Sequence, residues 1–171
     1  MKGFASLLAL LPLAFAQTNG TNGIGSTPSQ RSYISSTQAQ TIITAAIKNA
    51  TAQNIPQNIA VVDPSGLIVA FLRMDNAFPG SIDISIKKAK TAVLFNGLSS
   101  GQLYESSQPG QPLYGVQETN GGLVVFGGGF PVYYDGKLIG GVGVSGGSVA
   151  QDVKVATAGV EGLGASTSPP S

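Results

Sequence analysis

Few side chains of this chain could carry out nucleophilic or acid-base chemistry, because its 171 residues include no histidine, cysteine or tryptophan. Common zinc sites, Cys-His nucleophile pairs and Ser-His-Asp triads are therefore excluded. The remaining candidates are carboxylates, lysines, arginine, tyrosines, hydroxyls and backbone groups. We predict no metal site in the chain.

Three charged residues in the middle of the chain form the candidate acid-base or anion-binding site. Arg73 and Asp75 flank the expected end of a strand, and Lys88 lies on a helix that could return toward them. If they converge, Arg73 and Lys88 would bind an anion, and Asp75 or Glu118 would transfer a proton. The predicted catalytic residues are therefore Asp75, Glu118 and Lys88. The alternative is a set of structural ion pairs, with Asp152 complementing a helix dipole.

A glycine-rich run, Gly140–Gly147, stands between a predicted strand and a predicted helix. Its G-x-G-x-x-G pattern does not indicate a dinucleotide site, because no second parallel strand with an acidic end follows the helix. The free N–H groups of a helix start could still hold an anion such as a carboxylate. The expected ligand-binding positions, besides Arg73 and Lys88, are Gly143, Ser145, Gly146 and Gly147. The alternative is a tight turn in which glycine serves packing.

The N-terminal residues 1–16 have the pattern of a secretory signal peptide, with Lys2 before an apolar run and Ala14-Phe15-Ala16 at the cleavage site. We therefore expect a secreted protein. Its apolar run is too short to span a bilayer, and no other segment predicts a membrane span. Without residues 1–16 the chain has eight basic and eight acidic residues, which gives no reason to expect a nucleic-acid partner. Sequons at Asn19 and Asn49 predict a glycoprotein if the source is eukaryotic.

The rest of the chain predicts one α+β domain over residues 34–163, between a disordered segment, 17–33, and a flexible tail, 164–171. Capping-box patterns begin helices at Ser35 and Ser148, and a further helix is expected from about Ser81 to Phe95, with its lysines pointing away from its apolar face. Strands are expected at Asn58–Val62, Leu67–Met74, Leu123–Phe126, Phe130–Tyr134 and Lys137–Val144. The pattern predicts a five-stranded, mostly antiparallel sheet flanked by helices.

Five sequence blocks together resemble the GlcG/HbpS-like family, also called the haem-degrading domain family. The blocks occur in the family's order over roughly Ile34 to Leu163, and Asp152 follows the last of them: Val61–Gly66, Arg73–Asp75, Lys88–Ala92, Gly128–Pro131 and Gly140–Gly147. The resemblance implies a profilin-like fold and a protein that forms a homo-oligomer. It also implies haem or a related tetrapyrrole as the leading ligand.

Haem binding without histidine would need a tyrosine, a methionine or a weaker oxygen ligand. The candidate haem ligands are Met74, Tyr104, Tyr114, Tyr133 and Tyr134. For each of them an ordinary packing role is the alternative, since consecutive strand residues such as Tyr133 and Tyr134 point to opposite faces.

Three functions follow from these observations. The first is a secreted ligand-binding protein of the GlcG/HbpS type, with haem as its possible cofactor. The second is a lyase, an isomerase or a haem-linked oxidative enzyme that acts on a small anionic molecule. The third is an oligomeric structural or interaction protein without a small ligand.

Overall fold

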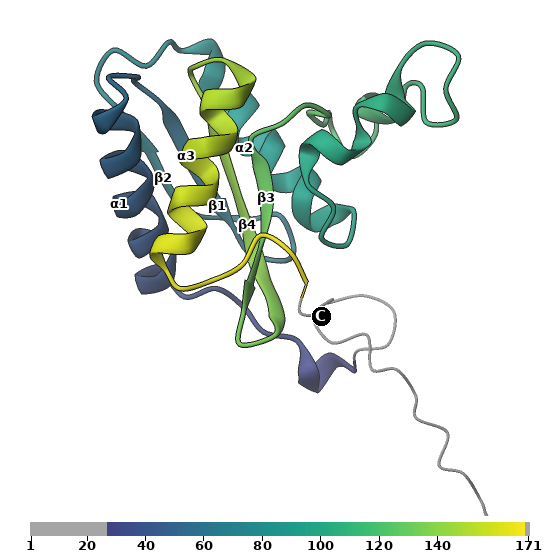
Figure 1. Cartoon of the computed structure of the whole chain (residues 1–171). Coiled ribbons are helices and arrows are strands. Elements are labelled where there is room, and N and C mark those ends of the chain that lie inside the picture. The colour runs from purple at the N-terminus through teal and green to yellow at the C-terminus, as the bar shows by residue number, and fades with distance from the viewer. Residues whose placement is uncertain (1–26, 170–171) are drawn as a thin grey trace, which may run out of the picture.

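The computed structural model describes residues 27–169 of the chain (Figure 1). The predicted signal peptide, residues 17–26 of the predicted disordered segment and the last two residues lie outside this range. Within it the elements follow in the order α1 (Ser36–Ala52), β1 (Asn58–Val62), β2 (Ile68–Arg73), α2 (Gly80–Leu94), β3 (Gly129–Tyr134), β4 (Lys137–Ser145) and α3 (Val149–Gly162). In the same range, no helix is long and apolar enough to cross a membrane.

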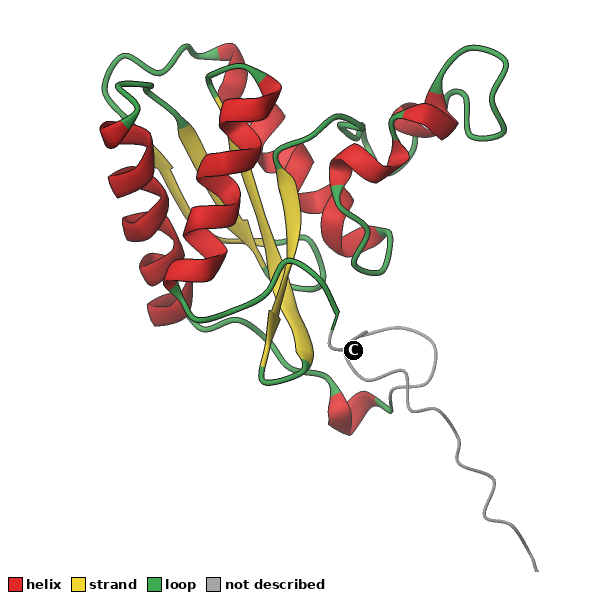
Figure 2. Cartoon of the chain, viewed as in Figure 1, coloured by secondary structure: helices red, strands yellow, loops and turns green. Residues whose placement is uncertain are grey.

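The strands form one antiparallel sheet in the order β2-β1-β4-β3. Helices α1 and α3 cover one face of this sheet and α2 covers the other (Figures 1 and 2). Side chains alternate along β1: Ile59 and Val61 belong to the larger core under α1 and α3, whereas Ala60 and Val62 face α2. The predicted α+β class with helices on both faces of the sheet is confirmed.

The prediction of a fifth strand at Leu123–Phe126 is wrong, because the sheet has four strands. Part of the backbone of this segment bonds to side chains instead of to a strand. Val124 accepts from Thr91 Oγ1 at 2.9 Å, and Phe126 accepts from Ser100 Oγ at 2.6 Å. At Val124 and Phe126 these hydroxyls therefore take the place that a neighbouring strand would have, and the apolar run stays outside the sheet.

The predicted helix starts at Ser35 and Ser148 are confirmed. The hydroxyl oxygen of each serine accepts from the backbone N–H three residues later. In turn, the side-chain oxygen of Gln38 or Gln151 accepts from the backbone N–H of the serine. Both capping boxes fix where the chain turns from an extended segment into a helix. For α3 this point lies directly after the glycine-rich end of β4.

Both predicted flanking segments have structure within the described range. Residues 28–30 form a short, exposed 3-10 helix, η1 (Pro28–Gln30). At the other end, the segment predicted as a flexible tail, 164–171, makes one contact with the sheet. Ser166 exchanges two backbone hydrogen bonds of 2.9 Å with Tyr133. Strand β3 is an edge of the sheet, and Ser166 satisfies part of its unpaired backbone.

Helix α2 lies so close to the sheet that glycine is required beneath it. A Cβ atom on Gly143 would overlap the carbonyl oxygen of Ser85, and one on Gly129 would overlap that of Lys88. These two glycines are partners in the β3–β4 pairing, so they form a smooth patch on which the backbone of α2 rests. Gly143 therefore contacts α2 in this fold.

The close approach of α2 predicts opposite effects for two Gly-to-Ala changes. We expect Gly143→Ala to destabilise the protein by about 1–3 kcal/mol, because the new methyl group must push α2 away. Gly80→Ala, in the first turn of α2, should be neutral or stabilising, since its Cβ would meet only the Phe78 ring at 3.7 Å. Urea denaturation of both variants measures the difference. Equal destabilisation would show that α2 does not rest on Gly143.

Candidate functional site

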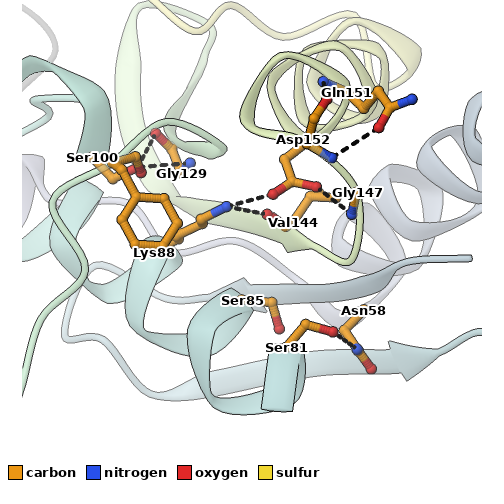
Figure 3. A network of polar contacts seen from close by, with 12 residues as sticks. Asn58, Ser81, Ser85, Lys88, Ser100, Gly129, Val144, Gly147, Gln151 and Asp152 are labelled. Carbon is orange, nitrogen blue, oxygen red and sulfur yellow. Dashed lines mark hydrogen bonds and ion pairs between the residues drawn. The ribbon is translucent and has the colours of Figure 1, made fainter. Parts of the chain in front are cut away.

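A buried ion pair between α2 and α3 is the central polar feature of the fold (Figure 3). Lys88 Nζ lies 2.7 Å from Asp152 Oδ2 and donates to the carbonyl oxygen of Val144 at 3.0 Å. The side chains are 0% and 3% exposed. The ammonium also lies 4.8 Å from the centre of the Phe126 ring, within the range of a cation-π contact.

The second oxygen of Asp152 extends this network to the glycine-rich turn. Asp152 Oδ1 accepts from the Gly147 N–H at 3.0 Å, so one carboxylate joins α2 to the start of α3. Next to it, Ser100 Oγ accepts from the Gly129 N–H at 2.9 Å. The Lys88–Asp152 network therefore ties α2, β4 and α3 together at one end of the sheet, and the separate Ser100–Gly129 bond holds the beginning of β3 beside it (Figure 3).

Burial determines both the pKa of the Lys88 amine and its accessibility. Burial lowers the pKa of its amine from the ordinary value, while the hydrogen bond and the charge of Asp152 act in the opposite direction. The ammonium is in contact with Asp152, Val144 and the Phe126 ring, and the side chain has no exposed surface. The expectation that Lys88 points away from the buried face of its helix is wrong, and this geometry favours the structural ion pair.

The other expected acid-base residues lie apart from Lys88. Arg73, Asp75 and Glu118 are exposed, and within residues 27–169 no hydrogen bond or ion pair joins them to the Lys88 network. Arg73 of β2 and Ser145 of β4 do lie in one row across the sheet, because both are paired with Asn58 of β1, which stands between them. The carboxylate that meets Lys88 is thus Asp152, and Asp75 stands elsewhere.

At this end of the sheet lies one buried polar residue that no pattern in the sequence singled out. The side chain of Gln57 is 0% exposed, and neither atom of its carboxamide has a hydrogen-bond partner. It lies directly beneath the turn: Cβ atoms built on Gly146 and Gly147 would stand 2.9 Å from Gln57 Oε1 and 3.0 Å from Gln57 Nε2. Gln57 precedes a buried strand in an otherwise ordinary loop, so composition and spacing gave no reason to select it.

The candidate haem ligands divide into enclosed and exposed side chains. Tyr133 is 4% exposed and lies against Gly97, and burial raises the pKa of its phenol. Met74 packs against the main core. Tyr104, Tyr114 and Tyr134 are exposed. Among the described residues, no group of three His, Cys, Asp or Glu side chains could hold a metal ion.

Two of the exposed tyrosines lie on one segment, residues 98–122, which we call the arm. It contains three short 3-10 helices, η2 (Ser100–Leu103), η3 (Glu105–Ser107) and η4 (Val116–Glu118). Its two ends lie near α2, and its middle extends away from the sheet (Figure 2). The Leu113 N–H donates to the Ser106 carbonyl at 2.9 Å, which brings the parts that hold Tyr104 and Tyr114 together.

Residues 34–161 match the family described as haem-degrading protein HbpS-like. The chain belongs to this family. It is 48% identical over 100 residues to an uncharacterised 15.0 kDa protein of Citrobacter freundii, with 58% of this chain and 70% of that protein covered. It is also 37% identical over 124 residues to the corrinoid adenosyltransferase PduO of Salmonella typhimurium, which covers 72% of this chain and only 37% of the transferase.

A solved structure with the same fold is that of a PduOC:heme complex. It has a TM-score of 0.74 and 34% sequence identity, and the match covers 79% of this chain and 98% of that one. The sequence blocks that suggested the GlcG/HbpS-like family therefore identified it correctly. These blocks include Lys88 and the glycines beneath α2, which in this structure serve the packing of α2 and α3.

The buried ion pair predicts a large difference between two neighbouring lysines. Lys88→Met should destabilise the protein by about 3–5 kcal/mol, because Asp152 would be left as an unpaired buried charge. Lys87→Met is the matched control: its ion pair with Asp83 is largely exposed, so we expect a change of about 0.5 kcal/mol or less. Urea denaturation measures both effects.

The double variant Lys88→Met/Asp152→Leu tests the cause of this loss. It should be more stable than Lys88→Met, because no charge remains buried. If the losses in unfolding free energy at the two positions simply add in the double variant, the two side chains do not stabilise the fold as a direct pair.

Proposed function

We propose that this protein binds haem or a related tetrapyrrole, with a phenol of the arm as the axial ligand. The observation on which this rests is the exposure of Tyr104 and Tyr114 on one projecting segment, 47% and 65% respectively. Tyrosine is a known axial ligand of haem iron. Membership in the HbpS-like family and the likeness to the haem complex of PduOC support the same ligand class.

The chemistry of the arm fits a flat, largely apolar ligand with acidic substituents. Leu98 and Leu113 are both 40% exposed, which supplies apolar surface beside the phenols. A cation stands at the base of the arm, where Lys87 Nζ is 3.0 Å from a Cβ built on Gly122. A propionate could share this ammonium with Asp83, whose Oδ2 lies 2.8 Å from it, and the macrocycle could cover the leucines. The bound group would supply the redox or ligand chemistry of its iron, and the arm would supply binding and orientation.

Haem titration of tyrosine variants tests this proposal. We expect Tyr104→Phe or Tyr114→Phe to remove the phenolate-to-iron charge-transfer band and to raise the Kd for ferric haem at least about tenfold, or about 1.4 kcal/mol. The removed hydroxyls are exposed, so the variants should fold normally, and circular dichroism verifies this.

Tyr134→Phe is the matched control, because Tyr134 is also exposed, at 40%, but lies outside the arm on β3. It should bind haem like the parent protein. If only Tyr134→Phe loses the band, the arm is not the site. If the parent protein binds no haem at all, the proposed function is wrong.

Self-association remains a second part of the proposal, and the edge strand β2 supports it. Among the described residues β2 pairs only with β1, and its segment Ile68–Leu72 has no charge and no proline. Leu67, Ile68 and Phe71 are 66%, 51% and 36% exposed. Such an edge is a template for pairing with another strand, and two antiparallel copies of β2 would form a symmetric dimer.

A charge on β2 should prevent this pairing. We expect the parent protein to be a dimer or a larger oligomer by light scattering, and Phe71→Lys to shift it to the monomer, because two lysines would meet near the symmetry axis. Leu113→Lys, on the arm, is the control and should keep the parent mass. A parent protein that stays monomeric over a wide concentration range would contradict the proposal.

A further inference from the structure

Asparagine is followed directly by glycine at four places in the chain, and two of these pairs, Asn96-Gly97 and Asn120-Gly121, lie within the described residues. Such a pair can react with itself, because the backbone nitrogen of the glycine can attack the asparagine carboxamide and glycine has no side chain to hinder the attack. In a folded protein the reaction depends on how firmly the structure holds that nitrogen. The two pairs differ in this respect.

Asn96-Gly97 follows the end of α2 and is held by both hydrogen bonds and packing. The Gly97 N–H donates to the carbonyl oxygen of Ala92 at 3.0 Å, and the Asn96 N–H donates to that of Val93 at 3.2 Å. The Tyr133 hydroxyl lies so close to Gly97 that a Cβ atom built there would overlap it. The Gly97 nitrogen can therefore reach the carboxamide only after the end of the helix opens and the packing on Tyr133 is lost.

Asn120-Gly121 forms the middle of an exposed turn at the base of the arm. The Gly122 N–H donates to the Thr119 carbonyl oxygen at 2.9 Å and closes this turn. Among the described residues, no acceptor bonds the Gly121 N–H itself. Asn120 and Gly121 are both exposed, and a Cβ atom built on Gly121 would meet no atom within 4 Å. No packing therefore resists rotation of the peptide group between the two residues.

The carboxamide of Asn120 is bonded through its nitrogen. Its Nδ2 donates to the Thr119 hydroxyl oxygen at 2.9 Å, and this hydroxyl donates to the Val116 carbonyl oxygen at 2.7 Å. Its carbonyl oxygen has no hydrogen-bond partner among the described residues, and the residue is exposed. Water can therefore stabilise the negative charge that develops on this oxygen when its carbon is attacked, and ammonia can leave directly into solvent.

We propose that Asn120 is a site of spontaneous deamidation. The Gly121 nitrogen forms a bond to Cγ of Asn120, the bond between Cγ and Nδ2 breaks, and the proton of the Gly121 N–H leaves with the ammonia. The product is a cyclic imide. Water then opens this ring at either carbonyl carbon, which gives aspartate or isoaspartate. The whole reaction consumes water, releases ammonia and needs no oxidant or cofactor.

The reaction changes the charge at the base of the arm. A neutral amide becomes a carboxylate close in the chain to Gly122, where a Cβ atom would stand 3.0 Å from Lys87 Nζ. Isoaspartate also adds a methylene group to the backbone of the turn. The modification thus acts slowly on the segment that holds Tyr104 and Tyr114, and it occurs whether or not the arm binds haem.

The test is to incubate the full chain at mildly alkaline pH, which favours loss of the amide proton, and to follow both pairs by peptide mapping with mass spectrometry. We expect Asn120 to convert at least about tenfold faster than Asn96, because at Asn96 the bond to Ala92 and the packing on Tyr133 must first be lost. Isoaspartate at position 120 identifies the cyclic imide as the intermediate, since direct hydrolysis of the carboxamide gives aspartate alone.

The same chain unfolded in guanidinium chloride is the control. Both pairs should then convert at similar rates, since each has glycine after the asparagine and neither is held by structure. In the folded chain, Asn120→Gln should strongly slow formation of an acidic product at 120, because attack on the longer side chain needs a larger ring, and should leave Asn96 unchanged.

Three results would overturn the proposal. The first is equal conversion of Asn96 and Asn120 in the folded chain, and the second is faster conversion of Asn96. The third is an unchanged Asn120 in the folded chain over a period in which the unfolded chain reacts there. All three are measured on the parent protein, so they do not depend on the folding of a variant.

Discussion

The buried pair of Lys88 and Asp152 is the contact on which the arrangement of this fold depends. It joins α2 to α3 through the end of the sheet, because the ammonium also bonds to Val144 in β4 and the carboxylate also bonds to Gly147. A buried charge without a partner costs several kcal/mol, so each element must stay where the other needs it. The pair therefore contributes to specifying the positions of the helices, even if its net stabilisation is small.

The glycines of β3 and β4 make this pair possible. Lys88 can reach Asp152 only if α2 lies close to the sheet, and a side chain at Gly129 or Gly143 would hold it away. The same closeness leaves little room for a ligand under α2. Glycine is required at 146 for a different reason, since its φ of +150° is rarely adopted by other residues. A single glycine-rich sequence block thus serves helix packing in its strand and the turn at its end.

Local patterns in the sequence predicted most of the fold, because they depend on local physics. Two capping serines, the apolar period of the segment that forms α2, the turn at Asp63–Gly66 and the apolar strand runs placed three helices and four strands correctly. Leu123–Phe126 looked equally strand-like, and only the hydroxyls of Thr91 and Ser100, distant in sequence, explain why it stays outside the sheet. Lys88 was placed outward because helical periodicity treats lysine as polar, whereas its partner is 64 residues away.

The candidate site could be predicted only in part for the same reason. Spacing indicated Lys88 and the Gly146–Gly147 turn, and both do lie at one end of the sheet with Asp152 between them. Gln57 could not be found, since its importance comes from burial without a partner. The tyrosines show the converse: four were equal candidates in the sequence, and the fold separates them by enclosing Tyr133 while leaving Tyr104 and Tyr114 exposed on the arm. Packing thus decides which of the residues that look alike in the sequence remain accessible to a ligand, and among the candidate tyrosines it leaves Tyr104, Tyr114 and Tyr134 accessible.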